Sequence, residues 1–271
     1  MRRRTSAGFR RAVTRGDIGR WTWIGLGMAV TALFLLLSGS VFFVPPSVDK
    51  ETNCREDQAP KLHVVVLVDR TDPLTKLQTD NLRKIVLEEA RRLPRHEWLS
   101  IYTITQTTDV SPIRVFSYCN PGRAPDAKVL VETAERIQQL HDTNFKRPLD
   151  VVLDEFTVAS THDQSPIVGS IEAISRLEPF TSVGSRRLVI VSDMLEHTAG
   201  FSHYRRIGGY DQIYRAQPYR DLKPNLAGTV VVIHQVGREK FRANQGPEHR
   251  LFWRLFFQRF GATLDGDIRS L

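Results

Sequence analysis

Oxygen-bearing side chains stand at the points where apolar segments of this chain end. Asp69 and Thr71 follow the apolar, largely β-branched run Leu62–Val68, and Asp193 directly follows a second apolar run. Ser165 precedes a proline at the expected start of a helix. Both runs are typical of strands buried on both faces, as in parallel sheets. Since the carboxyl ends of such strands meet at one edge of the sheet, where ligands bind, we expect these four side chains to lie together.

Two carboxylates and two hydroxyls, with no thiolate and no paired histidines, form a set of hard oxygen donors. Such donors suit Mg²⁺ or Mn²⁺, which prefer oxygen and keep several waters. We therefore predict a weak site for one of these cations, with Asp69, Thr71, Ser165 and Asp193 as its residues. The simpler alternative is that residues 69–72 are only turn and helix-cap residues.

Alternating strands and helices are predicted from residue 62 onward. The strands are expected at Leu62–Val68, Trp98–Ile104, Ile113–Tyr118, Leu188–Ser192, Gly228–Val236 and Gly261–Leu264. The helices are expected at Pro73–Leu93 with Asp72 as N-cap, at Asp126–His141, from Pro148, from Pro166 with Ser165 as N-cap, at Tyr210–Tyr219 and at Glu248–Phe260. The short link between the second and third strands predicts an antiparallel hairpin. This order predicts a doubly wound, mostly parallel α/β sheet.

An uncharged segment of 24 residues, Trp21–Val44, lies between an arginine-rich start and the globular part. A helix of this length can cross the bilayer core, which is roughly 30 Å thick. The run is longer than the apolar core of a cleaved signal peptide, so we favour an uncleaved anchor over that alternative. The arginines predict a cytoplasmic tail (1–20), followed by the anchor, a proline-bearing stalk (45–61) and a periplasmic domain (62–271) of a single-pass inner-membrane protein.

The basic charge of the chain is concentrated in its first 20 residues. The formal net charge is +8, and residues 1–20 hold seven Arg and one Asp. The remaining 251 residues therefore carry a net charge of only +2. A folded part with so little excess charge gives no reason to expect nucleic-acid binding.

The polar residues also carry a resemblance to a known family. The order Asp69, Thr71, Ser165, Asp193 resembles the metal-ion-dependent adhesion site of von Willebrand factor A domains. The first motif of that family is DxSxS, and here Thr71 stands in place of the first serine and Pro73 in place of the second. Ser165 takes the place of a threonine that enters a helix, and Asp193 that of an aspartate that ends the fourth strand. The resemblance implies the doubly wound fold with an antiparallel third strand, and a cation whose coordination is completed by a partner's carboxylate.

The resemblance covers about residues 60–265. Four short segments, VDRTDP, YCNPG, SPI and SDMLEH, together look like a group of bacterial extracytoplasmic proteins of this fold. The family's role implies a protein-binding module rather than an enzyme, with an unknown protein partner in the extracytoplasmic space. Two alternatives stay open: a metal-assisted phosphohydrolase that uses Asp69, and a scaffold whose metal site has decayed and binds no ion.

The two cysteines, Cys54 and Cys119, are predicted to form a disulfide outside the cytoplasm, the alternative being two unrelated thiols. Seven residues separate Cys54 from Leu62, which places Cys54 near the amino edge of the parallel strands. Cys119 follows the third strand, and an antiparallel third strand ends at that same edge. With the family's strand order the third strand lies two positions from the first, about 10 Å away, which the intervening residues can span. The bond would then clamp the stalk to the edge opposite Asp69 and Asp193, which would point the predicted binding face away from the membrane.

Overall fold

The computed structural model describes residues 15–42, 47–104, 111–128, 132–158, 161–205 and 221–271. The chain divides into two compact units, residues 1–45 and residues 46–271. The described part of the first unit is the helix α1, Arg15–Phe42, whose side chains are described for residues 22–36. Among the described residues, no helix is long and apolar enough to cross a membrane. The predicted anchor Trp21–Val44 extends beyond residues 22–36 at both ends.

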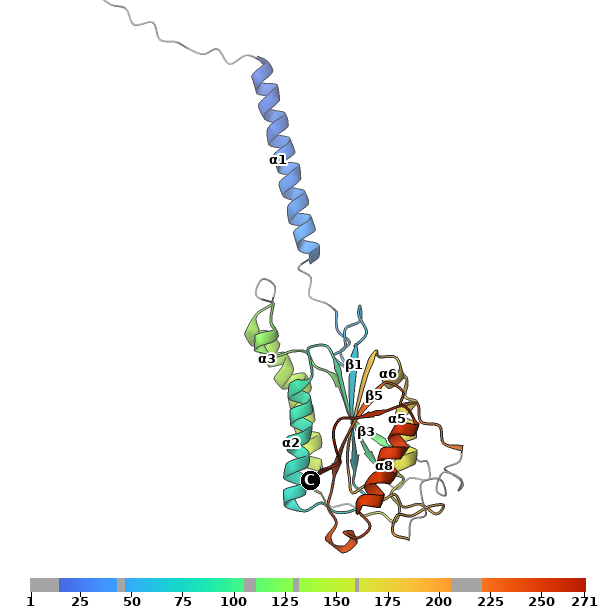
Figure 1. Cartoon of the computed structure of the whole chain (residues 1–271). Helices are drawn as coiled ribbons and strands as arrows, with labels where there is room; N and C mark the ends of the chain where they lie inside the picture. Colours follow the sequence, from blue (N-terminus) through green and yellow to red (C-terminus); the bar gives the residue numbers. More distant parts are fainter. Residues whose placement is uncertain (1–14, 43–46, 105–110, 129–131, 159–160, 206–220) are drawn as a thin grey trace, which may run out of the picture. The chain divides into compact units, whose positions relative to one another are not determined.

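The second unit is built on one mixed, mostly parallel sheet (Figure 1). Its strands are β1 Leu62–Asp69, β2 Trp98–Ile104, β3 Ile113–Cys119, β4 Ser185–Ser192, β5 Thr229–Gln235, β6 Thr263–Leu264 and β7 Arg269–Ser270. They run in the order β3-β2-β1-β4-β5-β6, and β7 also pairs with β5. Every pair is parallel except β2–β3, which is antiparallel. The predicted α/β sheet and its hairpin are therefore confirmed, while β4 begins three residues earlier than predicted and β7 is an addition.

Helices cover both faces of this sheet. They are α2 Lys76–Arg92, α3 Ala134–His141 and α4 Arg147–Glu155 on one face, and α5 Ile167–Ser175, α6 Glu178–Thr181 and α8 Pro247–Arg259 on the other. Figure 1 shows α2 and α3 on one side of the strands and α5, α6 and α8 on the other. The sheet is therefore the middle layer of three, as expected for strands that alternate with helices.

The central strand β1 is buried on both faces because its side chains alternate between two cores. Val65 and Leu67 enter the core beneath α5, α6 and α8. Val64, Val66 and Val68 enter the core beneath α2 and α4. All five side chains are at most 2% exposed, and burying each contributes roughly 1.5–3 kcal/mol relative to leaving it in water. This continuous apolar run fixes where β1 ends and therefore where the polar residues after it begin.

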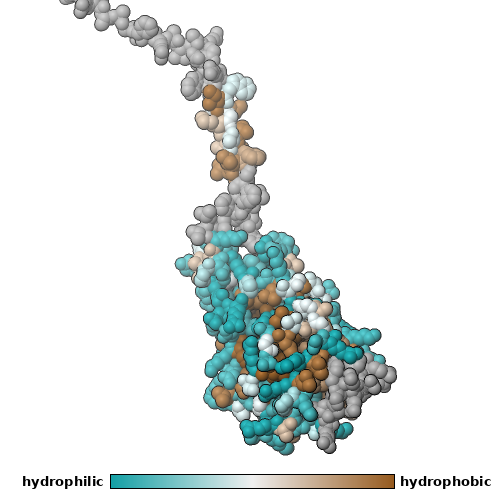
Figure 2. Space-filling model, viewed as in Figure 1, coloured by the Kyte–Doolittle hydropathy of each residue, from teal (hydrophilic) through white to brown (hydrophobic). Residues whose placement is uncertain are grey.

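Helix α8 is apolar on more than its inner face. Its aromatic residues Phe252, Trp253 and Phe256 enter the core beside β4 and β5. Leu251 and Leu255, one helical turn apart, are 50% and 37% exposed. Figure 2 shows hydrophobic residues gathered over α8 and the adjoining part of the sheet, within a surface that is otherwise mostly hydrophilic.

Helix α2 begins later than predicted because a capping box sets its start. Thr75 is the N-cap, and its Oγ1 accepts a hydrogen bond from Gln78 N at 3.3 Å. In return Gln78 Oε1 accepts from Thr75 N at 3.0 Å, so two backbone donors of the first turn are satisfied reciprocally. Asp72 is therefore not the N-cap and Pro73 is not the first helical residue; both precede the helix.

The helices before α5 also differ from the prediction in their bounds. α3 begins at Ala134, and Asp126, the predicted start, closes a short 3-10 turn instead. A π-helical turn, Asp142–Lys146, directly precedes α4, so that Pro148 stands in the first turn of α4 close to its predicted place. The predicted helix Tyr210–Tyr219 lies outside the described residues.

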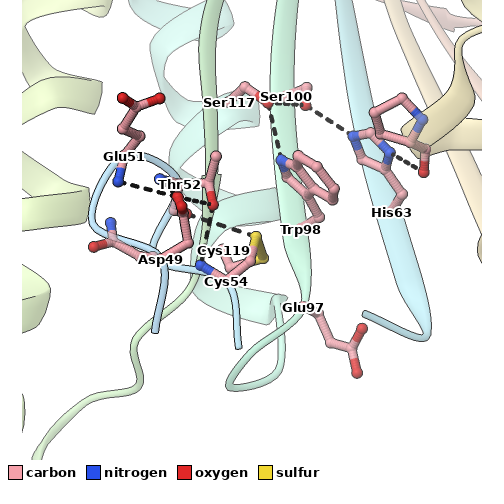
Figure 3. Close-up of a disulfide and its surroundings, with 12 residues drawn as sticks. Asp49, Glu51, Thr52, Cys54, His63, Glu97, Trp98, Ser100, Ser117 and Cys119 are labelled. Atoms are coloured by element: carbon pink, nitrogen blue, oxygen red, sulfur yellow. Dashed lines mark hydrogen bonds between the residues drawn. A yellow bond between two sulfur atoms is a disulfide. The ribbon is translucent and has the colours of Figure 1, made fainter. Parts of the chain in front are cut away.

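A disulfide between Cys54 and Cys119 closes the amino edge of the sheet, as predicted (Figure 3). The two sulfurs are bonded at 2.04 Å and the two Cα atoms are 4.9 Å apart. The backbone beside the bond is paired as well, since Cys119 N donates to Thr52 O at 2.7 Å. Asp49 Oδ1 in turn accepts from both the backbone N and the Oγ1 of Thr52 at 2.7 Å. The bond therefore joins an ordered turn of the predicted stalk to the end of β3.

Replacing both cysteines by serine should lower the free energy of unfolding by up to about 4 kcal/mol. The disulfide spans 65 residues of sequence, and closing a loop of that size restricts the unfolded chain. Urea denaturation of the full chain in detergent measures the change, and reduction of the wild-type protein should give the same loss. A double variant as stable as the oxidised wild type would contradict the expectation.

A buried hydrogen-bond chain crosses three strands near the disulfide (Figure 3). Trp98 Nε1 donates to Ser117 Oγ at 2.9 Å, and the Ser117 and Ser100 hydroxyls are 2.9 Å apart. Ser100 Oγ lies 2.8 Å from His63 Nε2, and His63 Nδ1 lies 3.1 Å from Pro179 O. Because a carbonyl only accepts, Nδ1 carries the ring proton and Nε2 accepts from Ser100. Burial lowers the pKa of His63 to about 4.

The contribution of His63 to the stability of the fold should therefore be lost as the pH falls from about 6.5 to about 4. The pKa of His63 in the folded state is below its ordinary value, so the stabilisation is present above pH 6.5 and is lost as the pH falls through 4. The loss due to His63 is about 3 kcal/mol. Between pH 7 and pH 4, the free energy of unfolding measured with urea should change in wild type relative to His63→Gln by a further loss of about 3 kcal/mol. An equal dependence in both proteins would mean that His63 does not act in this way.

Candidate functional site

Asp69, the last residue of β1, is the centre of a buried polar cluster at the carboxyl edge of the sheet. Its Oδ1 accepts hydrogen bonds from the backbone N of Thr71 at 3.0 Å and from Thr71 Oγ1 at 2.7 Å. Its Oδ2 accepts from Ser192 Oγ at 2.7 Å and from Ser165 Oγ at 3.1 Å. The Asp69 carboxylate thus joins the turn after β1, the end of β4 and the segment before α5. Asp69 itself is only 5% exposed.

Ser165 reaches Asp69 because its backbone is held at the sheet edge rather than in α5. The backbone N of Ser165 donates to His197 O at 2.8 Å, and His197 N donates to Ser165 O at 3.0 Å. The N-cap of α5 is Pro166, so the prediction that Ser165 caps the helix is wrong. The pairing with His197 takes Ser165 out of the helical path and directs its hydroxyl at the carboxylate.

Asp193 is the second carboxylate of the cluster and is 3% exposed. Its Oδ1 accepts from Leu195 N at 2.8 Å, and its Oδ2 accepts from Arg238 Nε at 3.0 Å. Burial, and after it the negative charge of Asp69, raises the pKa of Asp193 to about 7, against the opposing effects of the Leu195 amide and Arg238. The two carboxylates are therefore close enough to repel each other in a site with little solvent.

Arg238 follows the end of β5, and its guanidinium contacts three residues of this edge. Besides the bond to Asp193, Nη1 donates to Pro73 O at 2.6 Å and Nη2 donates to Asp72 O at 3.4 Å. The backbone N of Arg238 donates to Gln245 Oε1 at 2.9 Å, while Gln245 Nε2 donates to Asp193 O at 2.9 Å. Gln245 thus positions the cation and the carboxylate together, and the Arg238 side chain is 17% exposed.

The turn that carries Asp193 is held by the core beneath it. Met194 adopts a φ of +63°, a left-handed conformation that is unusual for a residue with a side chain. Its carbonyl lies 2.7 Å from His249 Nε2 and accepts from Trp253 Nε1 at 2.9 Å, both on α8. Its backbone N donates to Ser192 Oγ at 2.8 Å. These contacts fix the backbone next to Asp193 in a conformation that would otherwise be strained.

Two residues of the same loop, Glu196 and His197, form hydrogen bonds that hold the loop in position. Glu196 is fully buried, and its Oε2 accepts from Val168 N in the first turn of α5 at 2.8 Å. A carboxylate at a helix start is favoured by the positive end of the helix dipole. His197 Nδ1 lies 2.8 Å from Ser202 Oγ.

The structure brings the predicted site residues to one edge, and their role as metal ligands stays a prediction. Thr71 and Ser165 bond directly to Asp69, and Asp193 interacts with Asp69 through its charge. Three contributors were missed from the sequence: Ser192, Arg238 and Gln245. The first two carry the same signal as Asp69, a polar residue at or just after the end of a predicted strand. Nothing in the sequence indicates Gln245.

Two features of the arrangement oppose a cation at this edge of the sheet. The position of the second motif serine is Pro73, which offers no hydroxyl. One oxygen of Asp193 is bonded to the guanidinium of Arg238, so an ion at this oxygen would face a fixed positive charge.

An open pocket of about 660 Å³ adjoins the cluster, between the start of α2, the segment after β5 and the start of α8. Its charged lining residues are Asp72, Arg238, Glu239, Lys240, Arg242 and Arg250. The pocket therefore carries an excess of positive charge. Arg238 belongs to both the pocket and the buried cluster, and it is the point at which a ligand in the pocket would meet the cluster.

Tyr204 lies at the border of the same region. Its ring packs edge-on against the ring of Phe241, a pocket residue, with centroids 4.5 Å apart. Burial and the negative charges of Asp193, Asp72 and Asp69 raise the pKa of Tyr204, so its hydroxyl stays neutral. Tyr204 therefore has a neutral side chain beside the pocket residue Phe241.

Comparison with known proteins does not identify a family for this chain. No family model matches the chain, and no curated protein matches it. Chains of solved structures do match, among them an aerotolerance-related membrane protein from Bacteroides fragilis that carries multiple mutations to serine. The match has a TM-score of 0.30 and 13% sequence identity, and covers 65% of this chain and 67% of that chain. At this score the likeness adds nothing to the assignment of a site or a function.

Removing the central carboxylate should destabilise the fold strongly. Asp69→Ala leaves the Thr71 amide and three hydroxyls without their acceptor in a buried place, which we expect to cost about 3 kcal/mol of unfolding free energy. Ser192→Ala removes one of these bonds and also the acceptor of Met194 N, so it should cost about 2 kcal/mol. Urea unfolding followed by near-ultraviolet circular dichroism measures both.

The matched control is Glu239→Ala, which removes a carboxylate with an 85% exposed side chain from the same edge. This change should alter the unfolding free energy by no more than about 0.5 kcal/mol. If Asp69→Ala were as mild as Glu239→Ala, the hydrogen bonds of Asp69 would not hold this edge together.

Proposed function

We propose that this chain is a single-pass, membrane-anchored protein whose second unit binds another protein at the carboxyl edge of its sheet, outside the cytoplasm. In this proposal the second unit is a von Willebrand A-like binding module with no enzymatic role. The observation that carries the proposal is the pocket of about 660 Å³ that opens beside the buried cluster, with Arg238 common to both.

The anchor rests on the sequence. Trp21–Val44 has no charged side chain, and the arginines of residues 1–20 favour a cytoplasmic start by the positive-inside rule. The second unit then lies on the periplasmic side of the inner membrane. The bond between Cys54 and Cys119 supports this location, because disulfides persist in oxidising compartments.

The von Willebrand A-like class is supported by the places of the motif residues in the sheet. The strand order, with the antiparallel β3 at one edge, is the arrangement that the resemblance implies. Asp69 ends β1, Asp193 follows β4, and these two strands are neighbours. Pro73 is the departure from the motif, and it bears on the cation rather than on the fold.

A binding role agrees with the chemistry of the cluster better than catalysis does. A carboxylate that attacks a phosphoester needs an oxygen that the substrate can reach. Both oxygens of Asp69 already accept two hydrogen bonds each, and Asp69 is 5% exposed. No observation favours the phosphohydrolase alternative. The side chains that a partner can reach at this edge are those that line the pocket. Their excess of positive charge favours a partner with acidic side chains.

A photo-crosslinking amino acid at two positions tests this proposal in cells that make the full chain. Position 239 lies on the pocket at the carboxyl edge, and position 57 lies near the disulfide at the amino edge; both native side chains are exposed. We expect a protein adduct from position 239 that is absent from position 57. The adduct partner, identified by mass spectrometry and purified, should bind the wild-type chain.

The same partner should bind less well when Lys240→Glu removes the positive excess of the pocket. It should bind equally well after Lys50→Glu, which is far from the pocket in sequence and not part of its lining. Adducts that are the same at both positions, or absent from both, would contradict a binding face at the carboxyl edge.

A further inference from the structure

We propose that the guanidinium of Arg238 is the permanent cation of this cluster and takes the place of the divalent ion that the motif residues imply. The cluster then holds its two carboxylates together with no bound metal. The inference concerns the same edge as the proposed binding face, but it does not depend on the binding of a protein partner.

The two carboxylates of the cluster favour a positive charge nearby. Asp69 and Asp193 are 5% and 3% exposed, and they lie at the ends of adjacent segments of the sheet edge. Two buried carboxylates repel each other and lose the solvation that would weaken the repulsion. Hydroxyl and amide donors satisfy Asp69 but bring no net charge. A cation near Asp193 would relieve this repulsion.

Arg238 supplies this positive charge. Its Nε donates to Asp193 Oδ2 at 3.0 Å, and its two terminal nitrogens donate to the carbonyls of Pro73 and Asp72. The Asp72 carboxylate lies 4.0 Å from Nη2. The guanidinium thus contacts the turn after β1 and the residue after β4, the two segments that would share an ion in the motif.

Hydrogen bonds and burial hold Arg238 in this position. Its backbone N is bonded to Gln245, which is 9% exposed and also donates to the carbonyls of Asp193 and Val236. The side chain is 17% exposed, so it is not a solvated surface arginine. Pro73 stands where the motif has its second serine, whose hydroxyl would bind an ion. Here the carbonyl of Pro73 accepts a hydrogen bond from the guanidinium of Arg238 instead.

Mn²⁺ binding to the full chain in detergent, followed by electron paramagnetic resonance, tests the inference. We expect no bound Mn²⁺ in wild type up to millimolar concentration. Arg238→Ala removes the fixed charge and frees the Asp193 oxygen, so its affinity for Mn²⁺ should rise at least about tenfold. A further change of Asp193→Asn in that variant should remove the gain. Arg242→Ala, which removes a charge from the same pocket without contact to Asp193, should behave as wild type.

A second measurement needs only the wild-type protein and covers the case in which Arg238→Ala fails to fold. If no ion is resident, neither a chelator nor added Mn²⁺ should change the Tm, because a ligand that does not bind the folded state cannot stabilise it. Two results would overturn the inference: Mn²⁺ bound by wild type and lost in Asp69→Asn, or a Tm that the chelator lowers. A folded Arg238→Ala that binds no more Mn²⁺ than Arg242→Ala would overturn it as well.

Discussion

The four hydrogen bonds accepted by Asp69 are the constraint on which the carboxyl edge of this sheet depends. They come from three segments that are far apart in sequence: the turn at Thr71, the entry to α5 at Ser165 and the end of β4 at Ser192. Each donor loses water on folding and would be costly to leave without a partner. One carboxylate therefore fixes the relative positions of three segments, and one of them, the turn after β1, also lines the neighbouring pocket through Asp72 and Pro73.

The two edges of the sheet are held by different physical means. At the amino edge a covalent bond between Cys54 and Cys119 holds the segment before β1 against the end of β3. At the carboxyl edge only charges and hydrogen bonds act, and Arg238 spans from Asp193 to the carbonyl of Pro73. This difference agrees with the proposal that a partner binds at the carboxyl edge, where the contacts are reversible.

Local patterns predict most of the fold and part of the site. The apolar runs that became β1 and β4 carry their own signal, and so do the polar residues at their ends, because the carboxyl ends of parallel strands meet. The disulfide could be predicted because strand direction places both cysteines at one edge. The start of α2 was misplaced because Asp72-Pro73 and the Thr75–Gln78 capping box are both start signals, and the box satisfies more backbone donors. The contact of Arg238 with Asp193 could not be predicted, since it depends on how Gln245 packs.

The most direct measurement of the central claim is anomalous diffraction from crystals of the protein grown with Mn²⁺. The account predicts no anomalous peak between Asp69 and Asp193, with the Arg238 guanidinium bonded to Asp193 at the distance seen here, 3.0 Å. A manganese peak within coordination distance of the oxygens of Asp69, Thr71 or Ser165, with Arg238 turned away from Asp193, would contradict it.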